Sequence, residues 1–193
     1  MQEKIKQQIR SSAELKLKLL ESASLLSEIE NASRAIITAF RTNHKLLIAG
    51  NGGSAADAQH IAAEFVNKFN FDRPPLPAIA LTTDTSILTS VGNDSSFLQV
   101  FARQVSALGN EGDVFIGIST SGNSSNLIEA LREAGKKKIV TIGITGATGG
   151  TMKDLCDIGI MVPSEATPRI QEAQILIGHI ICSIVEEELF GNK

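Results

Sequence analysis

His60 and Glu64 are the two residues of this sequence whose types and spacing most directly indicate chemistry. They stand four positions apart in a stretch with a helical pattern, so their side chains project from one helix face. An imidazole and a carboxylate placed in this way can move protons near neutral pH, or they can bind a metal ion together. The pair therefore indicates an enzyme or a metal site.

A glycine-rich segment lies just before this pair and could bind an anion. The residues Gly50-Asn51-Gly52-Gly53-Ser54 follow the short apolar run 45–49 and open the predicted helix. Glycines let backbone N–H groups approach a ligand closely, and a helix N-terminus carries about half a positive charge. A phosphate anchor and a reactive pair on one element predict an enzyme that acts on a phosphorylated small molecule.

A second candidate phosphate loop is rich in hydroxyl groups and follows the apolar run 114–118. Its hydroxyl-bearing residues are Ser119, Thr120, Ser121 and Ser124, with Gly122 between them. Ligands of open parallel sheets bind beyond the carboxyl ends of the strands, where this loop would lie. The alternative is an ordinary polar loop in which Ser124 caps the next helix.

Composition excludes several functional classes. The chain has 193 residues, 42% hydrophobic content and a net charge of −3, as expected for one globular domain. It has no Trp or Tyr for stacking bases, and its basic run 136–138 reads as a solvated rim, so nucleic-acid binding is not expected. The apolar run 175–185 is too short for a membrane span of roughly 20 residues. Cys156 and Cys182 lie in apolar surroundings and are expected to be ordinary buried thiols of a cytosolic protein. Residues 1–10 are charged and polar rather than typical of a secretory signal, so we expect a cytoplasmic protein.

The pattern along the chain predicts an α/β fold in a single domain, 1–193. Residues 2–42 are predicted to be helical, with a break near Asn31, and their apolar stripe requires another subunit to cover it. Short apolar runs then alternate with helical stretches, which indicates a parallel sheet covered on both faces. The last helix, 168–189, is apolar on nearly every side, which predicts that it lies in an oligomer core. The domain thus divides into an oligomer-packing segment, 1–43, and a sandwich with its C-terminal helix, 44–193. The predicted strands are 46–49, 78–81, 114–118, 139–144 and 158–162, and the helical stretches between them are 54–68, 84–92, 96–107, 124–135 and 150–155.

The motifs 50–55, 57–64, 118–124 and 169–172, in this order, resemble the sugar isomerase (SIS) domain family. Within it, residues 5–189 are similar to the bacterial phosphoheptose isomerases. The resemblance implies a three-layer αβα sandwich with a five-stranded parallel sheet, assembled as a homotetramer. It also implies conversion of D-sedoheptulose 7-phosphate to D-glycero-D-manno-heptose 7-phosphate, the first step towards the nucleotide-activated heptose of lipopolysaccharide or related glycans.

The same resemblance implies roles for individual residues. It assigns the phosphate to the hydroxyl loop rather than to the glycine-rich one, which differs from the reading of the residues alone. The phosphate would be held by Ser119, Thr120, Ser121 and Ser124. The rest of the substrate would contact Asn51, Gly52, Gly53, Glu64, Asn93, Asp94 and Gln171. One zinc ion per subunit would be bound by His60, Glu64, Gln171 and His179.

The isomerase reaction needs a base that carries a proton between C1 and C2 through an enediol, and an acid that serves the two oxygens. We assign Glu64 as the base and His179 as the acid. Zinc stays an open question, because a metal-bound carboxylate is a poor base and glutamine is an unusual zinc ligand. Gln171 and His179 also lie eight residues apart, about 12 Å along one helix. A shared ion would require both side chains to stretch, or two subunits to contribute.

Two positions depart from the phosphoheptose isomerase pattern. Gln174 stands where a histidine is usual, and Asn67-Lys68 stands where Gly-Arg is usual. Both favour a sister branch, a non-catalytic SIS tetramer that binds the bacterial replication initiator DnaA. That branch lacks the residues corresponding to Glu64 and His179, which this chain keeps, so the enzyme is the preferred reading. A regulatory SIS module that senses another sugar phosphate is the third hypothesis.

Overall fold

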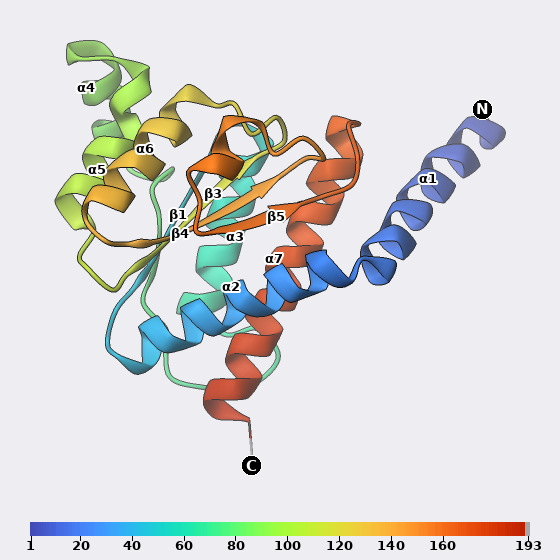
Figure 1. Cartoon of the computed structure of the whole chain (residues 1–193), viewed down its shortest axis with the longest axis horizontal. Helices are drawn as coiled ribbons and strands as arrows, with labels where there is room; N and C mark the ends of the chain where they lie inside the picture. Colours follow the sequence, from blue (N-terminus) through green and yellow to red (C-terminus); the bar gives the residue numbers. More distant parts are fainter. Residues whose placement is uncertain (192–193) are drawn as a thin grey trace.

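The chain folds as a three-layer αβα sandwich, described here from a computed structural model for residues 1–191 (Figure 1). The central sheet is parallel throughout, with the strand order β2-β1-β3-β4-β5. These strands match the five apolar runs, so the predicted fold class is confirmed. Their bounds are β1 Leu46–Gly50, β2 Ala78–Ala80, β3 Val114–Ser119, β4 Val140–Thr145 and β5 Ile158–Met161.

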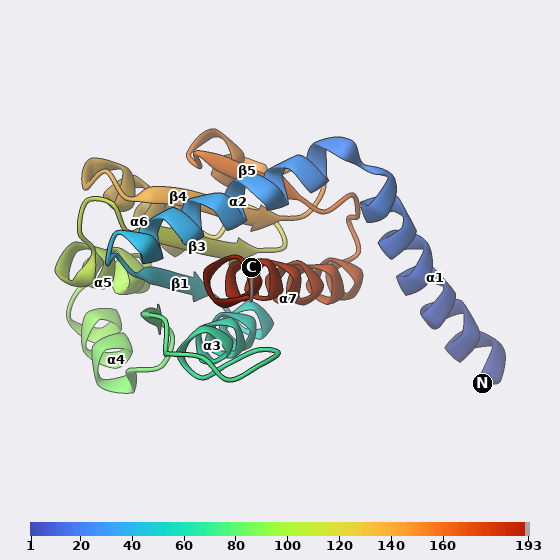
Figure 2. The ribbon, with the colours of Figure 1, turned by 90° about the horizontal axis from the view of Figure 1, so that it is seen from below.

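The two faces of the sheet are buried under different helices because successive side chains of a strand point to opposite sides. Leu46, Ile48 and Ile116 join the apolar core under α2 (Ala23–Arg41), α3 (Gly53–Val66) and α7 (Thr167–Phe190). Leu47 and Phe115 belong to the other core, under α5 (Val100–Leu108) and α6 (Ser125–Lys136). Figure 2 shows α2, α3 and α7 as separate rods on their side of the sheet. A peripheral helix, α4 (Thr85–Asp94), is joined to α5 by the 3₁₀ turn η1 (Phe97–Gln99).

The N-terminal segment consists of two helices, but the break lies elsewhere than predicted. α1 (Gln2–Glu21) ends at Ser22, which has an extended backbone, and the Ser22 hydroxyl accepts a hydrogen bond from Leu25 N at the start of α2. The predicted break near Asn31 is wrong, since Asn31 lies inside α2. A serine at the cap satisfies a free N–H of the new helix, which explains the position of the break. α1 projects away from the sandwich in both views (Figures 1 and 2).

α3 and α7 pack against each other closely, and this contact brings together residues far apart in the sequence. Both helices start beyond the carboxyl ends of strands, α3 directly after β1 and α7 after β5. Gly178 of α7 lies so near α3 that an added Cβ atom would stand 2.6 Å from Ile61 Cδ1. The absence of a side chain at Gly178 therefore allows the two helices to approach each other.

The remaining predicted elements agree with the structure, with two changes of type. The predicted helix 96–107 begins with the 3₁₀ turn η1 before α5. Residues Gly150–Asp154 form a 3₁₀ helix, η2, where a helical stretch was expected. Among the described residues, no helix is both long enough and apolar enough to cross a membrane. On α7, Ile177 and Ile181 are buried, whereas Ile180 and Ile184 are 36% and 39% exposed in the single chain.

Candidate active site

Both candidate phosphate loops lie side by side at the carboxyl edge of the sheet. β1 ends at Gly50 and β3 at Ser119, and the two strands are neighbours with Gly50 opposite Ile118. The side chains of Asn51 and Asn126 exchange two hydrogen bonds of 3.0 and 2.9 Å, which tie the glycine-rich loop to the start of α6. The loops thus form one continuous rim above β1 and β3.

The serine hydroxyls of the second loop, those of Ser119, Ser121 and Ser124, lie close to one another. Ser119 Oγ lies 2.9 Å from Ser124 Oγ and accepts a hydrogen bond from Gly122 N. Hydroxyls and backbone N–H groups clustered at a helix N-terminus are suited to bind a phosphate. A cavity of about 300 Å³ borders this loop, and its lining includes Thr120, Ser121, Asn123, Ser164 and Thr167.

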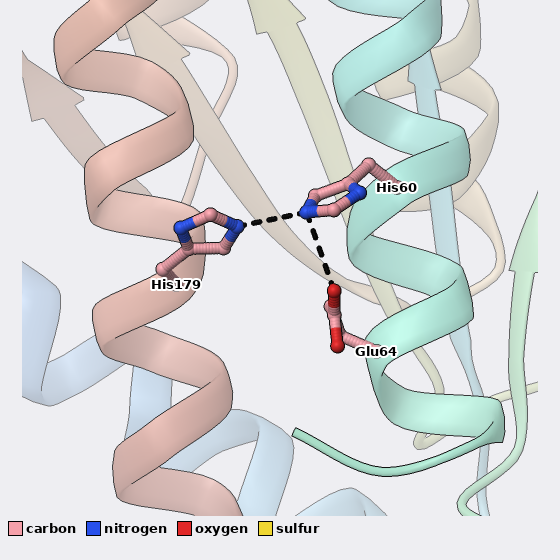
Figure 3. Close-up of side chains that lie close together, drawn as sticks. All are labelled: His60, Glu64 and His179. Carbon is pink, nitrogen blue, oxygen red and sulfur yellow. Dashed lines mark hydrogen bonds and ion pairs between the residues drawn. The ribbon is translucent and has the colours of Figure 1, made fainter. Parts of the chain in front are cut away.

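His60, Glu64 and His179 come together between α3 and α7 (Figure 3). His60 Nε2 lies 2.8 Å from His179 Nε2 and 3.3 Å from Glu64 Oε1. One ligand atom from each of the three residues lies within 4.8 Å of the others, so the group could hold a metal ion. The structure thus places the predicted i, i+4 pair beside His179 of α7, and the three side chains form one local cluster.

Asp57 is a further acidic group near this cluster, and the sequence analysis gave it no role. It lies one helical turn before His60, and its Oδ2 is buried without a hydrogen-bond partner among the described residues. Burial raises the pKa of Asp57, and the charges of His60 and His179 partly offset this effect. The three-residue spacing to His60 was a signal for its position, whereas its burial could not be read from the sequence pattern.

Gln171 lies at the beginning of α7, against the glycine-rich loop. A Cβ atom added at Gly53 would stand 2.7 Å from Gln171 Nε2, so only glycine leaves room for this amide. Gly53 precedes His60 by seven residues, which is about 10 Å along a helix. The amide of Gln171 is thus placed at the sheet edge, while the two imidazoles lie about two turns further along.

The other predicted residues are placed as follows. Asn93 and Asp94 lie exposed at the end of α4, where Asn93 Nδ2 donates to Asp94 Oδ1. Cys182 is buried and Cys156 half-buried, and both are free thiols. Burial raises the pKa of each thiol to about 12, so neither is an activated nucleophile.

Comparison with known proteins decides the family. The SIS domain model matches residues 9–146. Phosphoheptose isomerase 2 of Campylobacter jejuni is 60% identical over 188 residues, covering 97% of this chain and 94% of that protein. The chain belongs to the phosphoheptose isomerase family of SIS domain proteins. The phosphoheptose isomerase of Aneurinibacillus thermoaerophilus is 58% identical over 193 residues, covering 100% of this chain and 98% of that protein.

Solved structures agree with this phosphoheptose isomerase assignment. The phosphoheptose isomerase of Neisseria gonorrhoeae superposes with a TM-score of 0.90 at 41% identity, covering 96% of this chain and 98% of that one. The enzyme of Francisella tularensis gives a TM-score of 0.91 at 39% identity, with 96% and 97% coverage. The family resemblance inferred from the motifs is thus confirmed over nearly the whole chain, despite the departures at 67–68 and 174.

Proposed function

We propose that this chain converts D-sedoheptulose 7-phosphate into D-glycero-D-manno-heptose 7-phosphate, the first step of ADP- or GDP-heptose biosynthesis. The observation that carries the proposal is the cluster of His60, Glu64 and His179, which lies on helices that start at the rim of the phosphate loops. Family membership favours this isomerase over the initiator-binding and sugar-sensing alternatives. The reaction would take place in the cytoplasm, where thiols stay reduced, in keeping with the two free cysteines.

Substrate binding would start at the phosphate. The hydroxyls of Ser119, Thr120, Ser121 and Ser124 would hold it at the start of α6, and the sugar chain would extend toward α3. The backbone of Gly52 and Gly53, with the amides of Asn51 and Gln171, would hydrogen-bond the sugar hydroxyls. The position of the Gln171 amide against Gly53 supports this substrate role more directly than a place among the metal ligands. Asn93 and Asp94 would contact the substrate from the end of α4.

Glu64 would then transfer the proton between the first two carbons. It would remove a proton from C1 of the ketose and return it to C2 of the enediol, while His179 moves the proton between O1 and O2. The hydrogen bond between the two Nε2 atoms requires that one imidazole donates to the other, so the tautomers of His60 and His179 would depend on each other. No thiol is needed for this reaction.

The donor set of two imidazoles and one carboxylate fits zinc, which favours nitrogen and oxygen ligands in open sites. His60, Glu64 and His179 would hold the ion, with Glu64 bound weakly enough to act as the base, and Gln171 is the further ligand that the family resemblance implies. Bound zinc would supply a Lewis acid that polarises the substrate oxygens.

An isomerase assay with sedoheptulose 7-phosphate tests the proposal, run as purified, after chelator treatment and after Zn²⁺ is added back. We expect turnover of this ketose, loss of turnover with the chelator and recovery with Zn²⁺. Turnover that survives complete metal removal would refute the metal role alone. Absence of turnover under all three conditions, with binding of other sugar phosphates, would instead favour the sensing module.

A further inference from the structure

A buried ion pair lies directly beyond the candidate site, at the other end of the contact between α3 and α7. Arg73 Nε donates to Glu186 Oε1 at 2.9 Å, and the two side chains are 1% and 0% exposed. Burying two charges costs free energy unless hydrogen bonds satisfy their remaining groups. The further hydrogen bonds of Arg73 and Glu186 therefore show which parts of the chain the ion pair holds in place.

Arg73 binds the main chain at the end of α3. Its Nη2 donates to the carbonyl oxygen of Glu64 at 2.8 Å, and its Nη1 donates to that of Phe65 at 2.7 Å. The last carbonyls of a helix have no partner within the helix, so the guanidinium satisfies them. The backbone of Glu64 is thus attached to a side chain that is itself fixed to α7.

Glu186 holds the segment that follows α3, and this segment touches His179. The two carboxylate oxygens of Glu186 accept hydrogen bonds from Phe69 N at 2.8 Å and from Asn70 N at 2.6 Å. The Phe69 ring packs on the His179 imidazole with a centroid distance of 5.4 Å. The ring of Phe69 therefore limits how the imidazole can rotate away from His60.

We propose that Arg73, Glu186 and Phe69 are positioning residues that hold Glu64 and His179 in the geometry needed to bind a metal ion and move protons. This inference rests on the proposed function of the cluster. In the proposed function, none of these three residues contacts the substrate. They act through the Glu64 carbonyl and the His179 ring, so their loss should affect metal affinity and kcat more than KM.

The chain provides a matched control at the opposite edge of the sheet. Asp113 is buried, accepts hydrogen bonds from the backbone N–H groups of Lys45 and Asn110, and pairs with Lys45 Nζ at 2.6 Å. Like Glu186, Asp113 combines a buried ion pair with hydrogen bonds from two backbone N–H groups. It lies just before β3, at the amino end of the strand, whereas the candidate site lies beyond the carboxyl end. Asp113→Asn should therefore reduce stability in the same way without moving the cluster.

The test measures Zn²⁺ affinity by competition with a chromophoric chelator, together with kcat and KM, in the full chain. We expect Glu186→Gln and Phe69→Leu to weaken Zn²⁺ binding at least tenfold and to lower kcat, whereas Asp113→Asn stays within twofold of the wild type. Phe69→Leu keeps every hydrogen bond of the ion pair, so it decides the question if Glu186→Gln does not fold. Folded variants with unchanged Zn²⁺ affinity and kcat would overturn the inference, as would equal weakening by Asp113→Asn.

A metal-free readout separates this inference from the proposed function. The chain has three histidines, so its imidazole NMR spectrum contains three sets of signals. Glu186→Gln should shift those of His60 and His179 and leave His44 in place, while Asp113→Asn should affect only His44. A wild type that neither binds Zn²⁺ nor turns over substrate would contradict the proposed function. The positioning role is tested separately, because unchanged His60 and His179 signals in folded Glu186→Gln would overturn it.

Discussion

At the scale of single residues, the proposed phosphate loop contains serine hydroxyls that already contact one another. Ser124 Oγ lies 2.9 Å from Ser119 Oγ, and we assign both to the phosphate. Ser124→Ala removes one hydrogen bond to a charged group, which is worth about 1.5–3 kcal/mol. We expect KM for sedoheptulose 7-phosphate to rise by about tenfold or more, with a smaller change in kcat, because phosphate binding is alike in the ground and transition states.

Ser125→Ala is the matched control for this prediction. Ser125 is the exposed neighbour at the first position of α6. Steady-state kinetics should give wild-type values for it. Equal KM values for Ser124→Ala and the wild type would remove Ser124 from the phosphate site.

The sequence predicted part of the candidate site at this scale. The His60–Glu64 pair follows from helical spacing alone. His179 could be added only through the family resemblance, because 119 residues separate it from His60. Asp57, Phe69, Arg73 and Glu186 were not singled out, since what distinguishes them is burial and contact across helices, which a single chain pattern does not show.

At the scale of elements, the start of α3 depends on a glycine that leaves room for the first turns of α7. Gly53→Ala would place a Cβ atom 2.7 Å from Gln171 Nε2 and displace this amide. We expect kcat/KM to fall at least tenfold while thermal stability changes little, because the displaced group is the end of a flexible side chain. Kinetics and a thermal melt of the same preparation check both parts.

Gly135→Ala serves as the control in α6, where nothing lies within 4 Å of an added Cβ atom. It should stabilise the helix by up to about 1 kcal/mol and leave kinetics unchanged. If Gly53→Ala leaves the kinetics unchanged, as Gly135→Ala should, then activity does not depend on the observed position of the Gln171 amide.

The strands and most helices were predictable because buried parallel strands are short apolar runs between helical patterns. The break in the N-terminal helices was not. Ser22 and Asn31 are both residues that cap helices well, and the choice between them depends on which apolar side chains the sandwich buries. Ile29 and Ile36 are both buried on α2, one on each side of Asn31 in the sequence, which fixes the helix across Asn31.

At the scale of the whole molecule, the outer helices expose apolar side chains that a further subunit would cover. Leu17 and Leu20 of the projecting α1 are 58% and 68% exposed, and Ile180 and Ile184 of α7 are partly exposed. We expect a homotetramer, as the sequence analysis proposed. Sedimentation equilibrium should give roughly 82 kDa for four chains of 20.5 kDa each. A monomer at micromolar concentration would contradict this assembly.

Acid should weaken the fold through Glu186. Burial acts to raise the pKa of this carboxyl, but hydrogen bonds from Phe69, Asn70 and Arg73 outweigh it and hold the pKa below the usual 4.5. The unfolded chain therefore binds more protons below pH 4.5, and the stabilisation is lost as pH falls through the native pKa. Glu186→Gln should cost about 3–5 kcal/mol near pH 7.

Denaturant unfolding between about pH 5 and pH 3 measures this effect. The wild type should lose stability more steeply with acid than Glu186→Gln, since the variant has no carboxyl to protonate there. Parallel pH profiles for the two proteins would show that Glu186 is not a source of the acid sensitivity.

The most direct test of the account is the turnover number of Glu64→Gln with sedoheptulose 7-phosphate. The variant keeps the shape of the side chain and removes the base, so kcat should fall about 10²–10⁴-fold while the far-UV spectrum and sedimentation match the wild type. Glu129→Gln, which alters a surface ion pair with Arg132, should retain full activity. A folded Glu64→Gln with kcat within about threefold of the wild type, a loss of less than 1 kcal/mol of transition-state stabilisation, would contradict proton transfer by Glu64.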